Sequence, residues 1–584
     1  MILKYLRKRD WSLVGVSIVL ISAMVYLELE IPGYMSSITT ELTSPMPDKN
    51  VIYGDGGMML ACAFGSLIVS VCVGFIAAYI AASLARTVRE KQFDRVQAFS
   101  SEEMNRFSTS SLITRSTNDI TQVQMAVAMG LIMLVRAPIM AVWAIMKIVD
   151  KNWEWTVVTA TAVLVIMMTV GLLMVFVFPK FKRIQGLTDN VNRVTRENLT
   201  GIRVVRAYNA EDYQEGKFRD ANKELTDTNL SAFRAMAFMY PVMMLVMNGL
   251  SLAIYWIGAV LINGTGPMNP ESFTLFSDMV VFSSYAMQIV MSFIMVIIIM
   301  MVLPRAMVAA RRVEEVIDTE PSIKDGNGVS GNDVKGKVEF RNVSFRYPGS
   351  PNDVIHDISF TAEKGETVAF IGSTGSGKTT LVDLIPRFYD VTEGQVLVDG
   401  TDVREYHLDD LRSRLGYVPQ KAFMFKGTVE SNVRYGSTSE DRTIEDVMKA
   451  VEIAQSKEFV ESKEGGYGAE IAQGGTNLSG GQKQRLSIAR AVCRRPEIYI
   501  FDDTFSALDY RTDKILRARL KEETAGTTTL IVAQRIGTIM DADRIVVLKD
   551  GAVAGIGKHD ELLHSCPEYL EIARSQLSEE ELGL

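Results

Sequence analysis

Six long apolar stretches fill the first half of this 584-residue chain and constrain its fold more than any other feature. Each carries few or no charges and is long enough to cross a bilayer, which takes about 20 helical residues. They cover residues 11–34, 57–85, 130–149, 155–178, 235–262 and 276–303. Because a backbone in lipid must satisfy its hydrogen bonds internally, these stretches predict six membrane-spanning α-helices.

Basic residues are distributed unevenly among the connections between the spans. The connections after the second and fourth spans are rich in Lys and Arg, whereas the connection after the first holds only Lys49 and that after the fifth holds none. Cytoplasmic loops carry the excess of positive charge in membrane proteins. We therefore expect a multi-pass protein of the cell membrane, with its amino terminus and everything after Leu303 in the cytoplasm.

The two basic connections have few Gly or Pro breaks, so the membrane helices should continue well beyond the bilayer. We expect short helices within them, near Arg115–Asp119 and near Tyr208–Asp212, that transmit movement to the spans. Arg136 and Asp278 are costly in lipid and are expected to face a cavity, a partner or each other.

The chain divides into three parts by composition. Residues 1–320 form the predicted transmembrane domain with its long cytoplasmic loops, and the polar, Gly-containing stretch 321–336 reads as a linker. A second domain, 337–584, opens with an alternating strand at 338–345.

A phosphate-binding loop is predicted at Gly372–Thr379, which reads GSTGSGKT between an apolar strand and an apolar helix. Glycines let backbone N–H groups surround phosphates, and the helix amino terminus adds positive potential. Lys378 reaches the terminal phosphates and Thr379 is placed to hold Mg²⁺. Asp502, at the end of a later strand, suits the carboxylate that organises Mg²⁺ in such ATPases.

Leu478, Ser479, Gly480, Gly481 and Gln482 spell LSGGQ between these two motifs. This order resembles that of ATP-binding-cassette (ABC) transporters, and the resemblance covers nearly the whole chain. It implies an α-helical transmembrane domain of six helices, as in ABC exporters, followed by an α/β P-loop nucleotide-binding domain.

The resemblance also implies the roles of individual residues. ATP is expected to contact Tyr347, Gly372, Ser373, Thr374, Gly375, Ser376, Gly377, Lys378, Thr379, Thr380 and Gln420. Mg²⁺ is expected at Thr379, Gln420 and Asp502, and a D-loop at Asp509. In ABC dimers each ATP lies between the phosphate loop of one subunit and the LSGGQ loop of the other, so residues 478–482 should complete a partner's site.

Two positions depart from the family pattern. Asp503 stands where the family has a catalytic glutamate, and Gln534 stands where it has a switch histidine. The shorter side chain withdraws the carboxylate by roughly 1 Å, and glutamine can neither carry positive charge nor relay a proton. We interpret this chain as the subunit of a heterodimeric exporter whose own site binds ATP but cleaves it slowly.

The transported compound is less constrained by the sequence. The chain has 31 Met, many in the third to sixth spans. Their flexible side chains suit a cavity for varied apolar molecules, although packing also accounts for them. We expect export of drugs or other small amphipathic compounds across a lipid membrane. Lipid or peptide export and a purely regulatory subunit are the alternatives. A net charge of −8 argues against a nucleic-acid partner.

Overall fold

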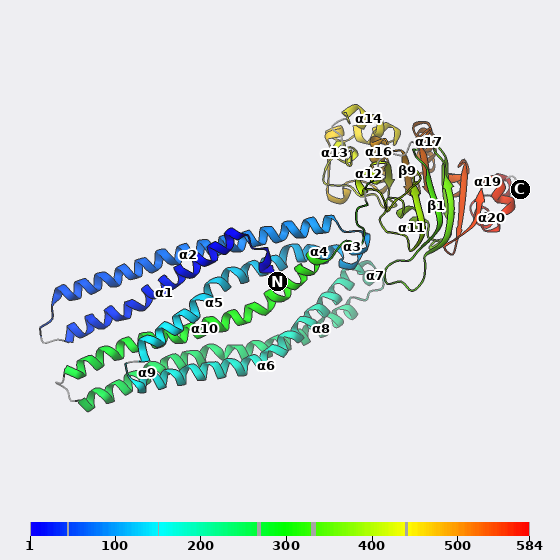
Figure 1. The fold of residues 1–584 in the computed structure, drawn as a ribbon. Helices are drawn as coiled ribbons and strands as arrows, with labels where there is room; N and C mark the ends of the chain where they lie inside the picture. The colour runs from blue at the N-terminus through cyan, green and yellow to red at the C-terminus, as the bar shows by residue number, and fades with distance from the viewer. Residues whose placement is uncertain are drawn as a thin grey trace. The chain divides into compact units, whose positions relative to one another are not determined.

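The computed structural model describes residues 2–43, 46–149, 151–265, 270–326, 328, 335–437 and 442–582. Within it the chain forms two compact units (Figure 1). One comprises Met1–Gln97 and Ser110–Thr319, and the other comprises Ala98–Thr109 and Glu320–Leu584. Of the predicted linker, residues 327 and 329–334 lie outside the described residues.

The first unit is built from long helices. They are α1 (Lys8–Thr43), α2 (Lys49–Gln97), α5 (Ile120–Val149), α6 (Trp153–Thr200), α8 (Glu211–Ala237), α9 (Met239–Thr265) and α10 (Pro270–Asp318), with the shorter η1 (Ile2–Tyr5), α4 (Thr109–Thr114), η2 (Arg115–Asp119) and α7 (Ile202–Ala207). Six helical segments among the described residues are long and apolar enough to cross a membrane, which confirms the predicted spans.

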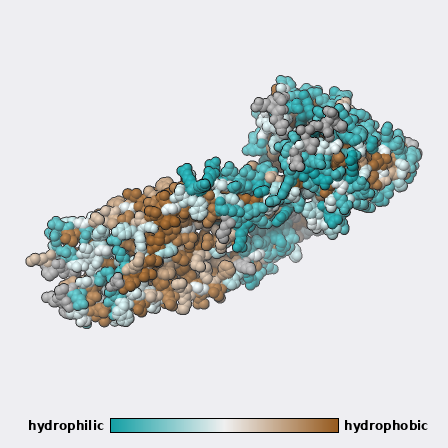
Figure 2. All heavy atoms as spheres, in the orientation of Figure 1, coloured by the Kyte–Doolittle hydropathy of each residue, from teal (hydrophilic) through white to brown (hydrophobic). Residues whose placement is uncertain are grey.

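These helices are much longer than a bilayer is thick. The 49 residues of α2 extend about 73 Å, against about 30 Å of hydrocarbon. In Figure 2 apolar residues form a band across the helical unit, and hydrophilic residues cover the part beyond it. The cytoplasmic connections are thus continuations of the membrane helices, as expected.

A short helical turn lies at the first predicted place, since η2 is π-helical over Arg115–Asp119. In the second connection the short helix α7 ends at Ala207, directly before the predicted Tyr208–Asp212. A further short helix, α3 (Ser101–Phe107), was not predicted; it begins with a capping box, in which the Ser100 hydroxyl accepts from the Glu102 N–H and the Glu103 carboxylate accepts from the Ser100 N–H at 2.8 Å. This box starts α3 at Ser101, and α3 belongs to the second unit.

The charged residues within the spans form ion pairs between helices. Arg136 Nη2 of α5 lies 2.8 Å from Glu28 Oε2 of α1, and Asp278 of α10 pairs with Lys151. Each therefore has its own counter-charge, so of the alternatives considered the structure does not show Arg136 and Asp278 paired with each other. Such pairing offsets the cost of placing these charges among apolar helices.

The second unit is an α/β fold, as predicted. A four-stranded sheet has the order β2 (Ile355–Ala362), β1 (Val338–Phe345), β4 (Glu393–Val398) and β5 (Thr401–Asp402). A six-stranded sheet has the order β12 (Ala552–Gly557), β11 (Arg544–Lys549), β3 (Thr367–Gly372), β10 (Thr528–Val532), β9 (Ile498–Asp502) and β6 (Leu415–Val418). A further pair is β7 (Gly427–Thr428) with β8 (Glu470–Ile471).

Helices and helical turns surround these sheets (Figure 1). They are α11 (Lys378–Asp383), α12 (Leu408–Ser413), α13 (Val429–Val433), α14 (Ile444–Ile453), α15 (Lys457–Glu461), η3 (Gly466–Gly468), η4 (Gln473–Gly475), α16 (Gly480–Arg494), α17 (Tyr510–Glu523), α18 (Ile536–Ile539), α19 (His559–Ser565), α20 (Pro567–Arg574) and α21 (Glu579–Leu582).

In the larger sheet the strands β6, β9, β10, β3 and β11 are parallel. Their carboxyl ends therefore share one edge, where ligands bind in open α/β sheets.

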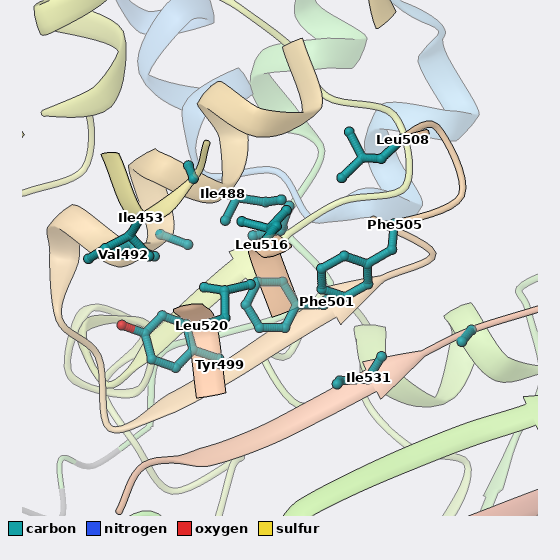
Figure 3. Close-up of a cluster of buried hydrophobic side chains, with 14 of the residues drawn as sticks. Ile453, Ile488, Val492, Tyr499, Phe501, Phe505, Leu508, Leu516, Leu520 and Ile531 are labelled. Atoms are coloured by element: carbon teal, nitrogen blue, oxygen red, sulfur yellow. The ribbon is translucent and has the colours of Figure 1, made fainter. Parts of the chain in front are cut away.

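A buried apolar cluster anchors the end of β9 (Figure 3). Phe501 directly precedes the predicted Mg²⁺ carboxylate, and Phe505 and Leu508 follow it on the next loop; all three are buried. Phe501 and Phe505 pack with ring centroids 5.5 Å apart. Burying these side chains fixes the backbone of residues 501–508, which carries the polar groups described next.

Candidate nucleotide site

The predicted phosphate loop joins β3 to α11. Gly375 and Gly377 have φ of +85° and +92°, in the left-handed region that favours glycine. A Cβ on Gly377 would lie 2.4 Å from the Ile355 side chain, so glycine is required there by contact as well. The Lys378 ammonium is buried and donates to the carbonyls of Gly372 at 2.8 Å and Ser373 at 2.7 Å. The loop thus folds around this cation, and burial lowers the pKa of Lys378.

Thr379 and Asp502 meet beside the loop, as predicted. The Thr379 hydroxyl donates to Asp502 Oδ1 at 3.0 Å. Asp502 is buried, and this burial raises its pKa. A hydroxyl and a carboxylate oxygen side by side are hard oxygen donors, and they fit Mg²⁺. Mg²⁺ held here would neutralise phosphate charge.

The two residues that depart from the family pattern come together with Gln420. Asp503, Gln420 and Gln534 follow the carboxyl ends of β9, β6 and β10, which are neighbours in the sheet. Gln534 Nε2 donates to Asp503 Oδ2 at 2.7 Å, and Gln420 Nε2 donates to the same oxygen at 3.1 Å. Asp503 is buried, with a left-handed φ of +44°. One carboxylate oxygen is therefore occupied by two amides.

Tyr347 lies beside the start of α11 within an aromatic group. Its hydroxyl shares a hydrogen bond of 2.9 Å with Thr380 Oγ1. Its ring stands edge-on to Phe345 and to Tyr389, with centroids 4.9 and 5.2 Å away. The predicted adenine-stacking residue is thus held next to the phosphate loop.

The LSGGQ residues form the start of α16. The Ser479 hydroxyl accepts from the Gln482 N–H at 3.3 Å, and Gln482 Oε1 accepts from the Ser479 N–H at 3.0 Å. A Cβ on Gly481 would lie 3.4 Å from the Ala507 carbonyl, so this helix start adjoins the predicted D-loop, where Asp509 caps α17. Figure 1 shows α16 apart from α11 within the second unit.

A partly buried acidic residue on the helix after the phosphate loop was not predicted from the sequence. Asp383, at the end of α11, accepts from the Tyr417 hydroxyl at 2.9 Å. Burial is the main cause that raises the pKa of Asp383 to about 6. No local pattern in the sequence marks Asp383, because its partner Tyr417 lies 34 positions away.

Asp383 should make the stability of the second unit depend on pH. Because its pKa is higher in the folded than in the unfolded chain, its contribution is complete below about pH 4 and is lost as the pH rises through about 6. We expect the free energy of unfolding to fall by about 1 kcal/mol from pH 5 to pH 8 on its account. Asp383→Asn should remove this dependence, measured by thermal unfolding of the full chain. Asp541→Asn, at an exposed carboxylate, is the control and should retain it.

Two family models match this chain. Residues 15–293 match the ABC transporter transmembrane region, and residues 355–506 match the ABC transporter model. The second match contains the phosphate loop, Gln420, the LSGGQ residues and Asp503.

Relatives match along most of the chain. An uncharacterized ABC transporter ATP-binding protein of Mycobacterium tuberculosis is 41% identical over 90% of this chain and 88% of its own. One of Bacillus subtilis is 35% identical over 97% of both chains. An ATP-dependent lipid A-core flippase of Pseudomonas aeruginosa is 30% identical over 91% of this chain and 87% of its own.

A solved structure shares the fold of the chain. It is a bacterial Atm1-family ABC exporter with ATP bound, with a TM-score of 0.79 over 98% of this chain and 100% of the exporter chain. The two sequences are 23% identical, so this likeness concerns the fold alone.

Proposed function

Since this chain belongs to the ABC transporter family, as a half-transporter with an exporter-type transmembrane region, we propose that it forms a heterodimeric exporter in which its own ATP site binds ATP but cleaves it slowly. It is a multi-pass membrane protein whose nucleotide-binding domain is cytoplasmic. The family match implies ATP binding by this domain. The division of labour between two different subunits is the proposal.

The observation that carries the proposal is the arrangement around Asp503. A residue that activates or positions water must present a carboxylate oxygen close to the reacting phosphorus. Here Oδ2 of Asp503 already accepts from Gln420 and Gln534, and the side chain is one methylene shorter than glutamate. Gln534 donates from an uncharged amide, so it supplies neither a cation nor a mobile proton to the γ-phosphate. Both features slow the cleavage step.

Most contacts that bind ATP are made by residues other than Asp503 and Gln534. The buried Lys378 and the glycine loop provide positive charge and backbone donors, and Tyr347 provides an aromatic face beside them. The Thr379–Asp502 pair supplies oxygen donors suited to Mg²⁺. These contacts stabilise the bound nucleotide in its ground state, and such uniform binding does not accelerate the reaction.

The LSGGQ loop supports pairing with a second half-transporter. Its Ser479 and Gln482 hold the start of α16 in a reciprocal capping arrangement, and a helix amino terminus is a place where backbone donors can bind a phosphate. We propose that this helix start completes an active site whose phosphate loop belongs to the partner. The slow site of this chain would then hold ATP while the partner's site turns over.

For the cargo we propose drugs or other small amphipathic compounds, which the Met-rich spans accommodate. Export of a lipid is the second candidate, and it is favoured by the similarity to lipid A-core flippases. Compounds of both classes would cross the membrane through the membrane-spanning unit and would contact membrane lipid.

The purified chain alone tests the proposal. In lipid nanodiscs we expect its ATP turnover to be on the order of 100-fold below that of the pair formed with its co-purified partner. Addition of amphipathic drugs or lipids should raise the ATP turnover of the pair. Brisk turnover by the single chain would overturn the heterodimer, and a stimulated ATPase without transport into vesicles would favour a regulatory subunit.

A further inference from the structure

Gln576, in the tail of the chain, contacts the loop that carries Gln534. It follows α20 and lies 42 residues from Gln534 in sequence. Its Nε2 donates to the Gln534 carbonyl at 2.8 Å, and its Oε1 accepts from the Ile536 N–H at 2.9 Å. One side-chain amide therefore holds two backbone groups of this loop at once, in the way that a neighbouring β-strand does.

The tail that presents Gln576 is firmly seated on the second unit. Tyr569 and Ala573 of α20 are fully buried, and Leu577 packs against the same apolar cluster. The Tyr569 hydroxyl also lies 2.7 Å from His559 Nδ1. Backbone bonds from Gln576 and Leu577 to the Ala573 carbonyl, at 3.1 and 2.9 Å, continue the last turn of α20. The exposed Gln576 side chain thus directly follows a helix that is anchored by buried residues.

The loop that Gln576 holds needs such support. Gln534 lies between β10 and α18, and the α18 helix has only four residues. The Gln534 side chain is largely exposed, so only its contacts restrict it. Its Nε2 gives one hydrogen to Asp503, and the amide has a second hydrogen free for another acceptor.

We propose that Gln576 is a positioning residue that holds Gln534 where its second amide hydrogen meets the γ-phosphate of bound ATP. The inference rests on the proposed role of Gln534 as the residue in the switch position. It adds that the tail after α20 belongs to the architecture of the nucleotide site. Gln576 acts through the loop backbone and does not itself touch the nucleotide.

Nucleotide selectivity tests this inference without requiring turnover. AMP-PNP has a terminal phosphate and ADP lacks it, so the ratio of their dissociation constants reports contacts to that phosphate. Gln576→Ala in the full-length chain should lower the preference for AMP-PNP by about fivefold, since a hydrogen bond to a charged group is only partly lost. The affinity for ADP should stay unchanged. Competition against a fluorescent ATP analogue measures both constants.

Two comparisons make the test specific. In a Gln534→Ala background, Gln576→Ala should have no further effect, because the side chain that it positions is gone. Gln576→Glu should behave like Gln576→Ala, since it keeps the acceptor for Ile536 but cannot donate to the Gln534 carbonyl. Ser575→Ala is the matched control; the Ser575 hydroxyl donates to the Ile572 carbonyl at 2.7 Å within the tail.

Several results would overturn the inference. The first is a wild-type chain without preference for AMP-PNP over ADP. The second is a Gln576→Ala variant that keeps the wild-type preference or loses AMP-PNP and ADP affinity equally. The third is a loss of preference on adding Gln576→Ala to the Gln534→Ala background, or a loss of preference in Ser575→Ala. The proposed slow site is judged separately, by the ATP turnover of the wild-type chain. Fast turnover would reject the slow site and leave the selectivity comparison valid.

Discussion

Replacing Asp503 by Glu and Gln534 by His together should raise ATP cleavage at this chain's own site by about 100-fold. The longer side chain moves the carboxylate roughly 1 Å toward the γ-phosphate, and imidazole can take a proton or carry positive charge. His also removes one of the two amides that occupy Asp503 Oδ2. The gain should appear mainly in kcat and not in KM, because the proposed contacts of Lys378 and Tyr347 with ATP are unchanged.

The single variants separate the two causes. Asp503→Glu alone should give a smaller gain, because Gln534 would still donate to the carboxylate. It also places Glu at a φ of +44°, which Asp tolerates better than most residues. Asp503→Asn should abolish the residual activity of this site. If the double variant shows no gain in the assembled pair with the partner's site silenced, the slow cleavage does not originate at these positions.

Gly480→Asp in this chain should reduce the turnover of the assembled pair by about 100-fold or more. A Cβ on Gly480 meets nothing within 4 Å, so the substituted chain should fold normally. The new carboxylate would lie at the amino terminus of α16, where the proposal places the phosphates of the partner's ATP. Repulsion between like charges replaces the attraction of the helix amino terminus.

Gly480→Ala is the matched control, since it adds the same Cβ without charge. Its turnover should stay within about threefold of wild type, because alanine is favourable near a helix start. Nucleotide binding at this chain's own phosphate loop should be unaffected by either substitution. Persistent turnover in the Gly480→Asp pair would place the active site elsewhere and would refute the shared arrangement.

The sequence predicted the architecture because its signals are local. Six apolar runs with few charges predict membrane helices, because backbone groups in lipid need internal hydrogen bonds, and the structure confirms them. The α/β fold of the second unit followed from a strand, a glycine loop and a helix in close succession. The short helical turn at Arg115–Asp119 lies where the sequence predicts it, and α3 follows from the capping box at Ser100, which is another local signal.

Pairings between distant residues could not be predicted in this way. Arg136 was recognised as costly, but its counter-charge Glu28 lies 108 positions away and is identified only by the packing of α1 against α5. Asp383 gave no signal of its raised pKa until burial and the Tyr417 hydroxyl were known.

By itself the sequence determined the six membrane spans and the glycine loop between β3 and α11, and it marked Asp503 and Gln534 as unusual, since each depends on residue type and short spacing. Only the tertiary structure decided how these parts meet. The parallel strands bring Gln420 and Gln534 onto one oxygen of Asp503, and α20 carries Gln576 to the loop after β10. The physical reason is that a hydrogen bond needs its atoms within about 3 Å, and for residues tens of positions apart only the packed sheet and its buried apolar core set that distance.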